Sequence, residues 1–291
     1  MKIKKSRNDI ILDIVIYLIL IAVTLATFYP VWYVLAASFA TSTELIKHPG
    51  FMLWPENFDA GAYKMVFENR LLMSGFSNSL KIMALSLPIN IVMTLFCGYF
   101  MAHGKMMLKK PIIMMIMFTM FFGGGMIPSF LNIKQLGLYD TIWALVLPGA
   151  MSVYNAIICK TAIEAIPDSL SESAYIDGAN DIQVLFKIIV PLLKPTLAVL
   201  LLYYGVAIWN SWFNAAIYIT EDARLPIQNI LRSILLANQN LSDAASGDNY
   251  NSYAETIKYA AIVVSTAPIL CVYPFLQKYF VKGAMIGAVK G

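Results

Sequence analysis

Six apolar stretches, each at least about as long as a membrane-spanning helix, constrain this chain more than any other feature of its sequence. A helix needs about 20 apolar residues to cross the hydrocarbon core of a bilayer. The stretches lie at roughly 13–39, 77–102, 111–131, 140–160, 192–219 and 257–280. Of the 291 residues 59% are hydrophobic and 13% charged, whereas soluble proteins are about 45–50% apolar and about 25% charged. The sequence therefore predicts an all-α membrane protein with six transmembrane helices in a single domain, residues 1–291.

The placement of Lys and Arg predicts how the chain crosses the membrane. Cytoplasmic loops are richer in these residues than outer loops. If the N-terminus is cytoplasmic, thirteen of the 21 Lys and Arg residues lie on that side, and the others are spread over longer outer loops. The apolar run after residues 1–7 is too long for a signal peptide, so we expect it to remain as the first span. Both termini are then predicted to be cytoplasmic.

Several function classes find no support in the sequence. The basic residues are scattered, so no nucleic-acid surface is expected. Cys97, Cys159 and Cys271 lie in apolar stretches, where cysteine acts as a small apolar side chain, so neither a disulfide nor a metal site is predicted. The sequence also contains no P-loop motif and no catalytic motif, so no enzyme activity and no catalytic residue are assigned to this chain.

The break between the fourth and fifth stretches, residues 161–191, is amphipathic and contains SESAYIDGANDIQVLFKIIVP. Pro167 is typical of a helix start, and Glu172 would be favoured by the helix dipole in the first turn. Gly178 ends this helix, Asn180 can cap the next one, and apolar residues then recur at helical spacing up to Pro191. The pattern predicts two short helices joined at a glycine elbow on the cytoplasmic side. Such an elbow is either an interfacial connector or a docking element for a soluble partner.

The elbow resembles the "EAA" motif of ABC importer permeases, E-A-A-x3-G-x9-I-x-L-P. Glu172, Gly178 and Pro191 keep its spacing, with Ser173 in place of Ala and Val190 in place of Leu. Two further stretches are similar to this binding-protein-dependent family, WPENFDAGAYKMVFENRLLMSGFSNSL at 54–80 to its first outer loop and LGLYDTIWALVLPGA at 136–150 to its fourth span. WNSWFNA at 209–215 and FVKGAMIGAVKG at 280–291 resemble its carbohydrate-importing, maltose-permease-G-like branch.

This resemblance implies a type I ABC importer permease fold whose elbow is the coupling helix that contacts an ATPase subunit. The residues that it assigns to ATPase docking are Glu172, Ser173, Ala174, Ile176, Asp177, Gly178 and Ala179, with Lys282 to Gly291 in the C-terminal tail, 281–291. Without the resemblance, a frayed end is the favoured description of that tail.

The resemblance also implies the setting in which such a chain acts. ATP and Mg would be bound by the partner ATPase, and no cofactor by this chain. The implied partners are a second homologous permease, a dimer of the ATP-binding subunit, an extracytoplasmic solute-binding protein and membrane lipid. The complex would lie in a bacterial cytoplasmic membrane and would work by alternating access. The long polar segment 220–256 is expected to be an outer loop that faces the binding protein.

An ion-coupled secondary transporter is the alternative. Such a transporter is expected to keep ionisable residues near the middle of its spans. Here the ionisable residues close to the spans lie at their ends: Asp13, Lys81, His103, Asp140 and Lys160. The sequence therefore favours the ATP-driven importer.

Aromatic and amide residues near the fifth stretch are typical of a sugar pathway, because sugars stack on rings and hydrogen-bond to amides. The candidates are Tyr203, Tyr204, Trp209, Asn210, Trp212, Phe213 and Asn214, followed by Ser77, Asn78 and Ser79. An interfacial aromatic belt is the alternative for the rings. The expected substrate is a neutral or weakly charged polyhydroxylated solute, and the resemblance suggests an oligosaccharide.

Overall fold

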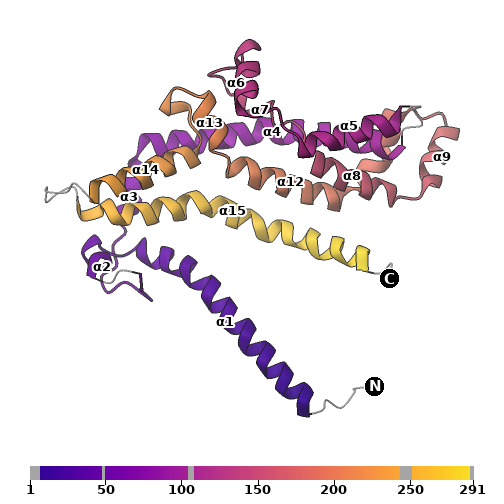
Figure 1. The fold of residues 1–291 in the computed structure, drawn as a ribbon. Helices are drawn as coiled ribbons and strands as arrows, with labels where there is room; N and C mark the ends of the chain where they lie inside the picture. The colour runs from indigo at the N-terminus through magenta and orange to yellow at the C-terminus, as the bar shows by residue number, and fades with distance from the viewer. Residues whose placement is uncertain (1–6, 48–49, 104–107, 243–250, 289–291) are drawn as a thin grey trace. The chain divides into compact units, whose positions relative to one another are not determined.

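The protein is described from a computed structural model that covers residues 7–47, 50–103, 108–242 and 251–288. Over these residues the structure consists of helices and connecting segments, without a strand (Figure 1). The chain forms two compact units. Unit 1 comprises residues 1–70 and 231–266, and unit 2 comprises residues 71–230 and 267–291.

Unit 1 is built on a long apolar helix, α1 (Arg7–Ala37), which contains the predicted first span. It also holds α2 (Ser42–Lys47), α3 (Gly61–Glu68), the later part of α14 (Ile227–Ser242) and the first part of α15 (Asn251–Ala288). Its core gathers at the C-terminal end of α1, where Ala36 and Ala37 pack with Leu45 and Met52. The apolar window of α1 itself contains no buried residue, as expected for a helix that faces lipid or another subunit.

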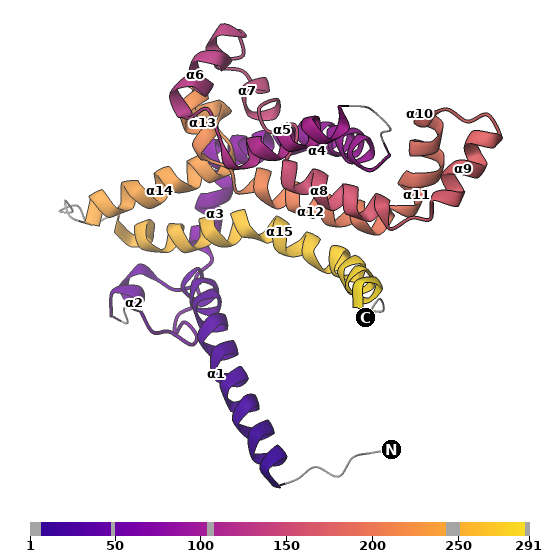
Figure 2. The same cartoon turned by 45° about the vertical axis from the view of Figure 1, so that its right-hand side comes forward.

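Unit 2 holds most of the remaining helices and both regions of functional interest. Its elements are α4 (Arg70–His103), α5 (Lys109–Phe121), α6 (Met126–Gln135), α7 (Trp143–Val146), α8 (Val153–Glu164), α9 (Asp168–Ile176), α10 (Asp181–Gln183), a π-helix (Val184–Ile189), α11 (Val190–Leu192), α12 (Lys194–Trp209), α13 (Phe213–Tyr218), a 3₁₀ turn (Asp222–Arg224) and the end of α15. The segment from α9 to α11 leads the chain out and back at one end of the unit (Figures 1 and 2).

Three helices are long and apolar enough to cross a membrane by themselves, namely α1, α4 and α15, at the first, second and sixth predicted spans. The third predicted span is divided between α5 and α6, which meet at 111°. The fifth begins at α12, which lies at 85° to the preceding helical segment, residues 181–192. Counting each bent pair as one span gives up to five spans among the described residues, so the count of six stays a prediction.

The fourth predicted span, 140–160, differs from the expectation of one continuous helix. The structure has α7 and α8 here, separated by non-helical residues Leu147–Ser152. This break contains Pro148 and Gly149. Proline removes a backbone donor and glycine is a poor helix former, so adjacent residues of these two types interrupt a helix even within an apolar stretch.

The expected outer loop at 220–256 is also largely helical in the structure. α14 covers Ile227–Ser242 and α15 begins at Asn251, while residues 243–250 lie outside the described residues. Ile227 and Ile230 are buried, three residues apart on one side of α14. The sequence-based expectation missed this helix because its polar face resembles a loop when only average polarity is considered.

Candidate functional site

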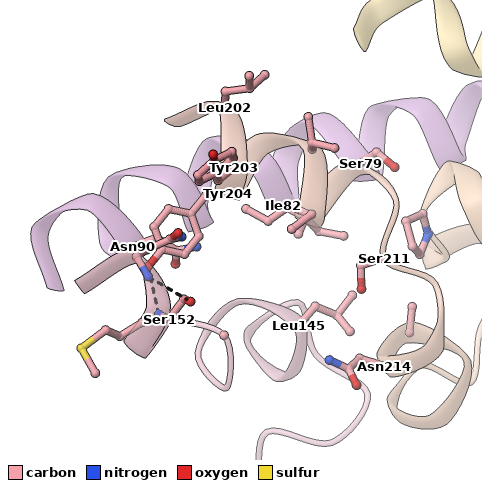
Figure 3. Close-up of a pocket in the computed structure, with 18 of the residues that line it drawn as sticks. Ser79, Ile82, Asn90, Leu145, Ser152, Leu202, Tyr203, Tyr204, Ser211 and Asn214 are labelled. Carbon is pink, nitrogen blue, oxygen red and sulfur yellow. Dashed lines mark hydrogen bonds between the residues drawn. The ribbon is translucent and has the colours of Figure 1, made fainter. Parts of the chain in front are cut away.

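A large cavity lies in unit 2 among α4, the α7–α8 break, α12 and α13 (Figure 3). Its volume is about 920 Å³. The polar residues that line it are Ser79, Asn90, Ser152, Tyr154, Asn155, Tyr203, Tyr204, Ser211 and Asn214. None of the described lining residues is Asp, Glu, Lys, Arg or His. The cavity thus offers hydroxyls, amides and rings to a guest, without a full charge.

Three of the predicted pathway residues, Tyr203, Tyr204 and Asn214, line this cavity together with Ser79. Sequence reasoning missed Asn90, Ser152, Asn155 and Ser211. The signal that was available is the polar series Ser86, Asn90 and Thr94 on α4, spaced by four residues within an apolar helix and therefore on one face.

The other predicted pathway residues lie elsewhere in unit 2. Trp209 is buried and packs edge-on against Phe76 of α4, with ring centroids 5.4 Å apart. The Asn210 side chain donates to the carbonyl of Val206, one turn earlier in its own helix. The ring of Trp212 packs on the ring of Phe213, and the backbone carbonyl of Trp212 accepts a hydrogen bond from the side-chain amide of Asn229 on α14. The contacts of Trp209 and Trp212 join different helices around the cavity, whereas the Asn210 bond stays within its own helix.

Asn78 has a comparable role on α4. Its side-chain amide donates to the carbonyls of Ala223 and Leu225, at 2.8 and 3.2 Å. The neighbouring hydroxyl of Ser79 accepts from the backbone N–H of Ile227 at 2.9 Å. Together these bonds tie the N-terminal half of α4 to the segment that leads into α14.

Tyr204 is one half of a buried polar clamp on the α7–α8 break. Its hydroxyl accepts from the backbone N–H of Ser152 at 2.9 Å and bonds to the Thr94 hydroxyl at 2.7 Å. Thr94 and Tyr204 are 0% and 5% exposed. The hydroxyl of Tyr204 is therefore held by α4 and by the break, while its ring contributes to the cavity wall.

Asn90 is the other half of the clamp. With its amide oriented so that both ends are satisfied, its nitrogen donates to the carbonyls of Gly149 at 3.3 Å and Ser86 at 2.9 Å. Non-helical backbone inside a membrane must find partners within the protein, because lipid offers none. Asn90 and Tyr204 supply such partners, so the break at Leu147–Ser152 is hydrogen-bonded to α4 and to α12.

The second region is the elbow that follows α8. α9 and α10 are joined across Gly178, whose φ is +83°, and a Cβ added there would meet nothing within 4 Å. Asn180 and Gln183 form a reciprocal capping box at the start of α10, with bonds of 2.9 and 3.0 Å. The structure thus contains the two short helices and the glycine turn that the sequence predicts. Its docking role stays a prediction.

The second arm of the elbow departs from a regular α-helix. Residues Val184–Ile189 form a π-helix that ends two residues before Pro191. Proline lacks an N–H group and its ring clashes with the carbonyl four residues earlier, and the wider π turn relieves that clash. Val184, Leu185 and Ile189 are buried in a cluster with Leu95 of α4 and with residues of α8 and α12.

The first arm is mostly exposed. Glu172, Ser173, Asp177 and Gly178 face solvent, and Ile176 at the tip is 86% exposed. Ala174 and Ala179 instead pack inward against the apolar cluster. In the predicted tail, Lys282 lies on α15, and Gly291 lies outside the described residues.

Comparison with known proteins agrees with this architecture. Residues 74–285 match the family model described as "Binding-protein-dependent transport system inner membrane component". The chain belongs to this family. It is accordingly a multi-pass membrane protein, with several helices of the length and composition that a bilayer requires.

Among curated members of this family, two from Bacillus subtilis (strain 168) align over nearly their whole length. The polygalacturonan/rhamnogalacturonan transport system permease protein YtcP is 39% identical over 96% of this chain and 98% of its own. Protein LplC is 40% identical over 97% of this chain and 95% of its own.

Among solved structures, a bacterial ABC transporter involved in the import of the acidic polysaccharide alginate contains a chain with a TM-score of 0.87. That chain is 30% identical, and the match covers 96% of this chain and all of that one. A chain of the alginate ABC transporter in complex with an alginate pentasaccharide-bound periplasmic protein has a TM-score of 0.53 at 17% identity, which shows likeness of fold alone.

Proposed function

We propose that this chain is a membrane-spanning permease subunit of an ATP-driven, binding-protein-dependent oligosaccharide importer. Its membership of the permease family and the names of its relatives support this proposal. The observation that carries it is the cavity of about 920 Å³, whose described lining offers hydroxyl, amide and aromatic groups without a charged side chain. Such a lining suits a solute that presents many hydroxyls and C–H faces.

The same lining speaks against the ion-coupled alternative. A secondary transporter is expected to hold its coupling ion or proton with ionisable side chains close to the substrate site. The described residues around this cavity provide none, and the family membership points to a subunit driven by ATP instead.

Two of the relatives are named for uronic-acid polymers, polygalacturonan and alginate. An oligosaccharide of this kind carries both hydroxyls and carboxylates. The cavity of this subunit matches the hydroxyls, and any carboxylate would be paired by another subunit of the importer. Uptake of neutral and uronate-containing oligosaccharides of equal length, measured side by side, would define the substrate.

The remaining parts of the proposal follow from the same family membership. The exposed arm of the elbow docks on an ATP-binding subunit, which holds ATP and Mg, while this chain binds no cofactor. A second homologous permease, an ATPase dimer and an extracytoplasmic solute-binding protein complete the complex. The chain lies in a bacterial cytoplasmic membrane with both termini inside, and the cavity opens alternately to the two sides.

A pair of asparagine variants tests the sugar pathway. Asn214 lines the cavity, whereas the Asn210 side chain bonds to its own helix outside it. Asn214→Ala is expected to raise the half-saturating concentration of loaded binding protein or to lower uptake, because an amide partner for the sugar is lost. Asn210→Ala should transport as the unmodified complex does. Equal uptake by the two variants would count against this cavity as the pathway.

A further inference from the structure

Three side chains from three segments meet where the elbow joins α4. Tyr99 lies near the C-terminal end of α4, Tyr175 lies on α9, and Asp181 opens α10. The Tyr175 hydroxyl donates to Asp181 Oδ1 at 2.6 Å, and the Tyr99 hydroxyl donates to the same oxygen at 3.3 Å. The two tyrosine hydroxyls are 3.0 Å apart. We call these three residues the elbow triad.

The chemistry of the elbow triad favours a firm contact. Hydrogen bonds to an ionised carboxylate are shorter and roughly twice as strong as those between neutral groups. Burial and the bond to Asp181 both raise the pKa of Tyr175, so its phenol keeps the proton that it donates at neutral pH.

The elbow triad closes a ring across the turn at Gly178. Tyr175 precedes that glycine and Asp181 follows it, so their hydrogen bond fixes the angle between the two arms, which the glycine alone leaves free. Tyr99 then attaches this fixed angle to α4. α9 also packs Ala174 against the apolar cluster and buries Ser171, and the Tyr175 hydroxyl adds hydrogen bonds to α4 and α10.

The α4 end of the contact is itself held in place. The ring of Tyr99 stacks on His103, with centroids 4.9 Å apart and planes 15° apart. Lys109 at the start of α5 donates to the carbonyl of Ala102 at 3.0 Å. The elbow triad lines a cavity of about 940 Å³ that Glu172 also lines, so the triad and this residue of the first arm border the same space.

α4 connects the elbow triad with the first cavity. It is one helix of 34 residues, Arg70–His103. Thr94 bonds to the Tyr204 hydroxyl, and Asn90 bonds to the α7–α8 break itself. They lie five and nine residues before Tyr99, or about 8 and 14 Å along the helix. A displacement of the elbow that pulls on Tyr99 would therefore be carried to the cavity wall by a single rigid element.

We propose that Tyr99, Tyr175 and Asp181 are positioning residues that fasten the elbow to α4 and so transmit the movement of a docked ATPase to the cavity. This proposal rests on the proposed function. Tyr99 lies outside the EAA pattern, and Tyr175 and Asp181 occupy positions that the pattern leaves unspecified, since its specified residues are Glu172, Ser173, Ala174, Gly178, Ile188, Val190 and Pro191.

The test compares Tyr99→Phe with Tyr139→Phe in the complete importer, reconstituted with its ATPase and binding protein. Tyr99→Phe removes one hydroxyl and leaves the ring that stacks on His103. Tyr139→Phe makes the same chemical change in the loop after α6, where the ring packs on Phe130. The readout is the amount of sugar transported for each ATP hydrolysed, measured beside ATPase retention and basal hydrolysis.

Tyr99→Phe is expected to assemble and to hydrolyse ATP, but to transport about 2- to 30-fold less sugar per ATP, the range for a loss of 0.5–2 kcal/mol of coupling. Tyr139→Phe should match the unmodified complex. The double variant Tyr99→Phe/Tyr175→Phe should be little worse than the more affected single variant, because both changes break one network.

An unchanged transport ratio in Tyr99→Phe would overturn the proposal. If that variant fails to accumulate, Tyr175→Phe gives the same decision, since it removes the hydroxyl that bonds to both Asp181 and Tyr99. A loss of transport that merely follows a loss of ATPase retention would also overturn it, because the role would then be structural. Failure of the proposed function would be seen separately, as an unmodified complex without ATP-driven uptake.

Discussion

The conformation of Gly178 leads to the sharpest prediction for the elbow. Its φ of +83° lies in the left-handed region, and a Cβ added there would meet nothing within 4 Å. A substitution therefore acts through backbone conformation and not through a clash inside this chain. Valine is β-branched and rarely adopts this region, at a cost of about 1–3 kcal/mol, whereas asparagine visits it routinely.

That cost can be converted into populations of the elbow. At about 1.4 kcal/mol per factor of ten, a penalty of 1–3 kcal/mol lowers the share of correctly bent elbows by about 5- to 150-fold relative to distorted ones. Gly178→Val should therefore insert and accumulate normally but lose a large part of the ATP hydrolysis stimulated by loaded binding protein. Gly178→Asn should retain most of it, because its side chain tolerates the same φ.

The assay is stimulated ATP hydrolysis by the purified complex in nanodiscs, with the amount of bound ATPase quantified for each variant. Two results would refute the reasoning. If Gly178→Val is stimulated as strongly as Gly178→Asn, the left-handed turn is not required for coupling. If Gly178→Asn is as inactive as Gly178→Val, the position does not tolerate any side chain, and the argument from φ fails.

Three further predictions concern the clamp, the docking face and the orientation. Tyr204→Phe leaves two buried polar partners unsatisfied, so we expect about 1–3 kcal/mol lower stability in thermal denaturation, with Tyr203→Phe, at a 41% exposed site, as a near-neutral control. Glu172→Ala should weaken retention of the ATPase during purification; unchanged retention would remove it from the docking face. In a background without native cysteines, Ile176→Cys should react with a membrane-impermeant thiol reagent only from the cytoplasmic side and Glu68→Cys only from outside. The reverse pattern would overturn the proposed orientation.

The elbow could be predicted from sequence because its determinants are local. Each determinant acts within a few residues: a proline before the first helix, a glycine between the two helices, and Asn180 with Gln183 at the start of the second helix. The structure contains the corresponding elements. The π-helix before Pro191 was not predicted, because it depends on how the chain accommodates that proline against the apolar cluster.

The cavity could be predicted only in part, because it is assembled from distant segments. Asn90 and Ser152 belong to it because Pro148 and Gly149 break the fourth stretch, which brings backbone groups within reach of α4. Nothing local in the sequence marks that pairing. Conversely, Trp209 is of the residue type expected to stack on a sugar, yet its ring packs on Phe76. Periodicity alone does not distinguish a tryptophan that binds a sugar from one that packs inside the protein.

Transport by the complete complex in proteoliposomes tests the central claim most directly. The vesicles would hold ATP inside, oligosaccharide-loaded binding protein outside, and the permease pair with its ATPase in the membrane. We predict that uptake of labelled oligosaccharide requires both ATP hydrolysis and the binding protein, and that it continues when ionophores collapse every ion gradient. Uptake that proceeds without ATP and stops when an ion gradient is collapsed would contradict the importer and identify a secondary transporter.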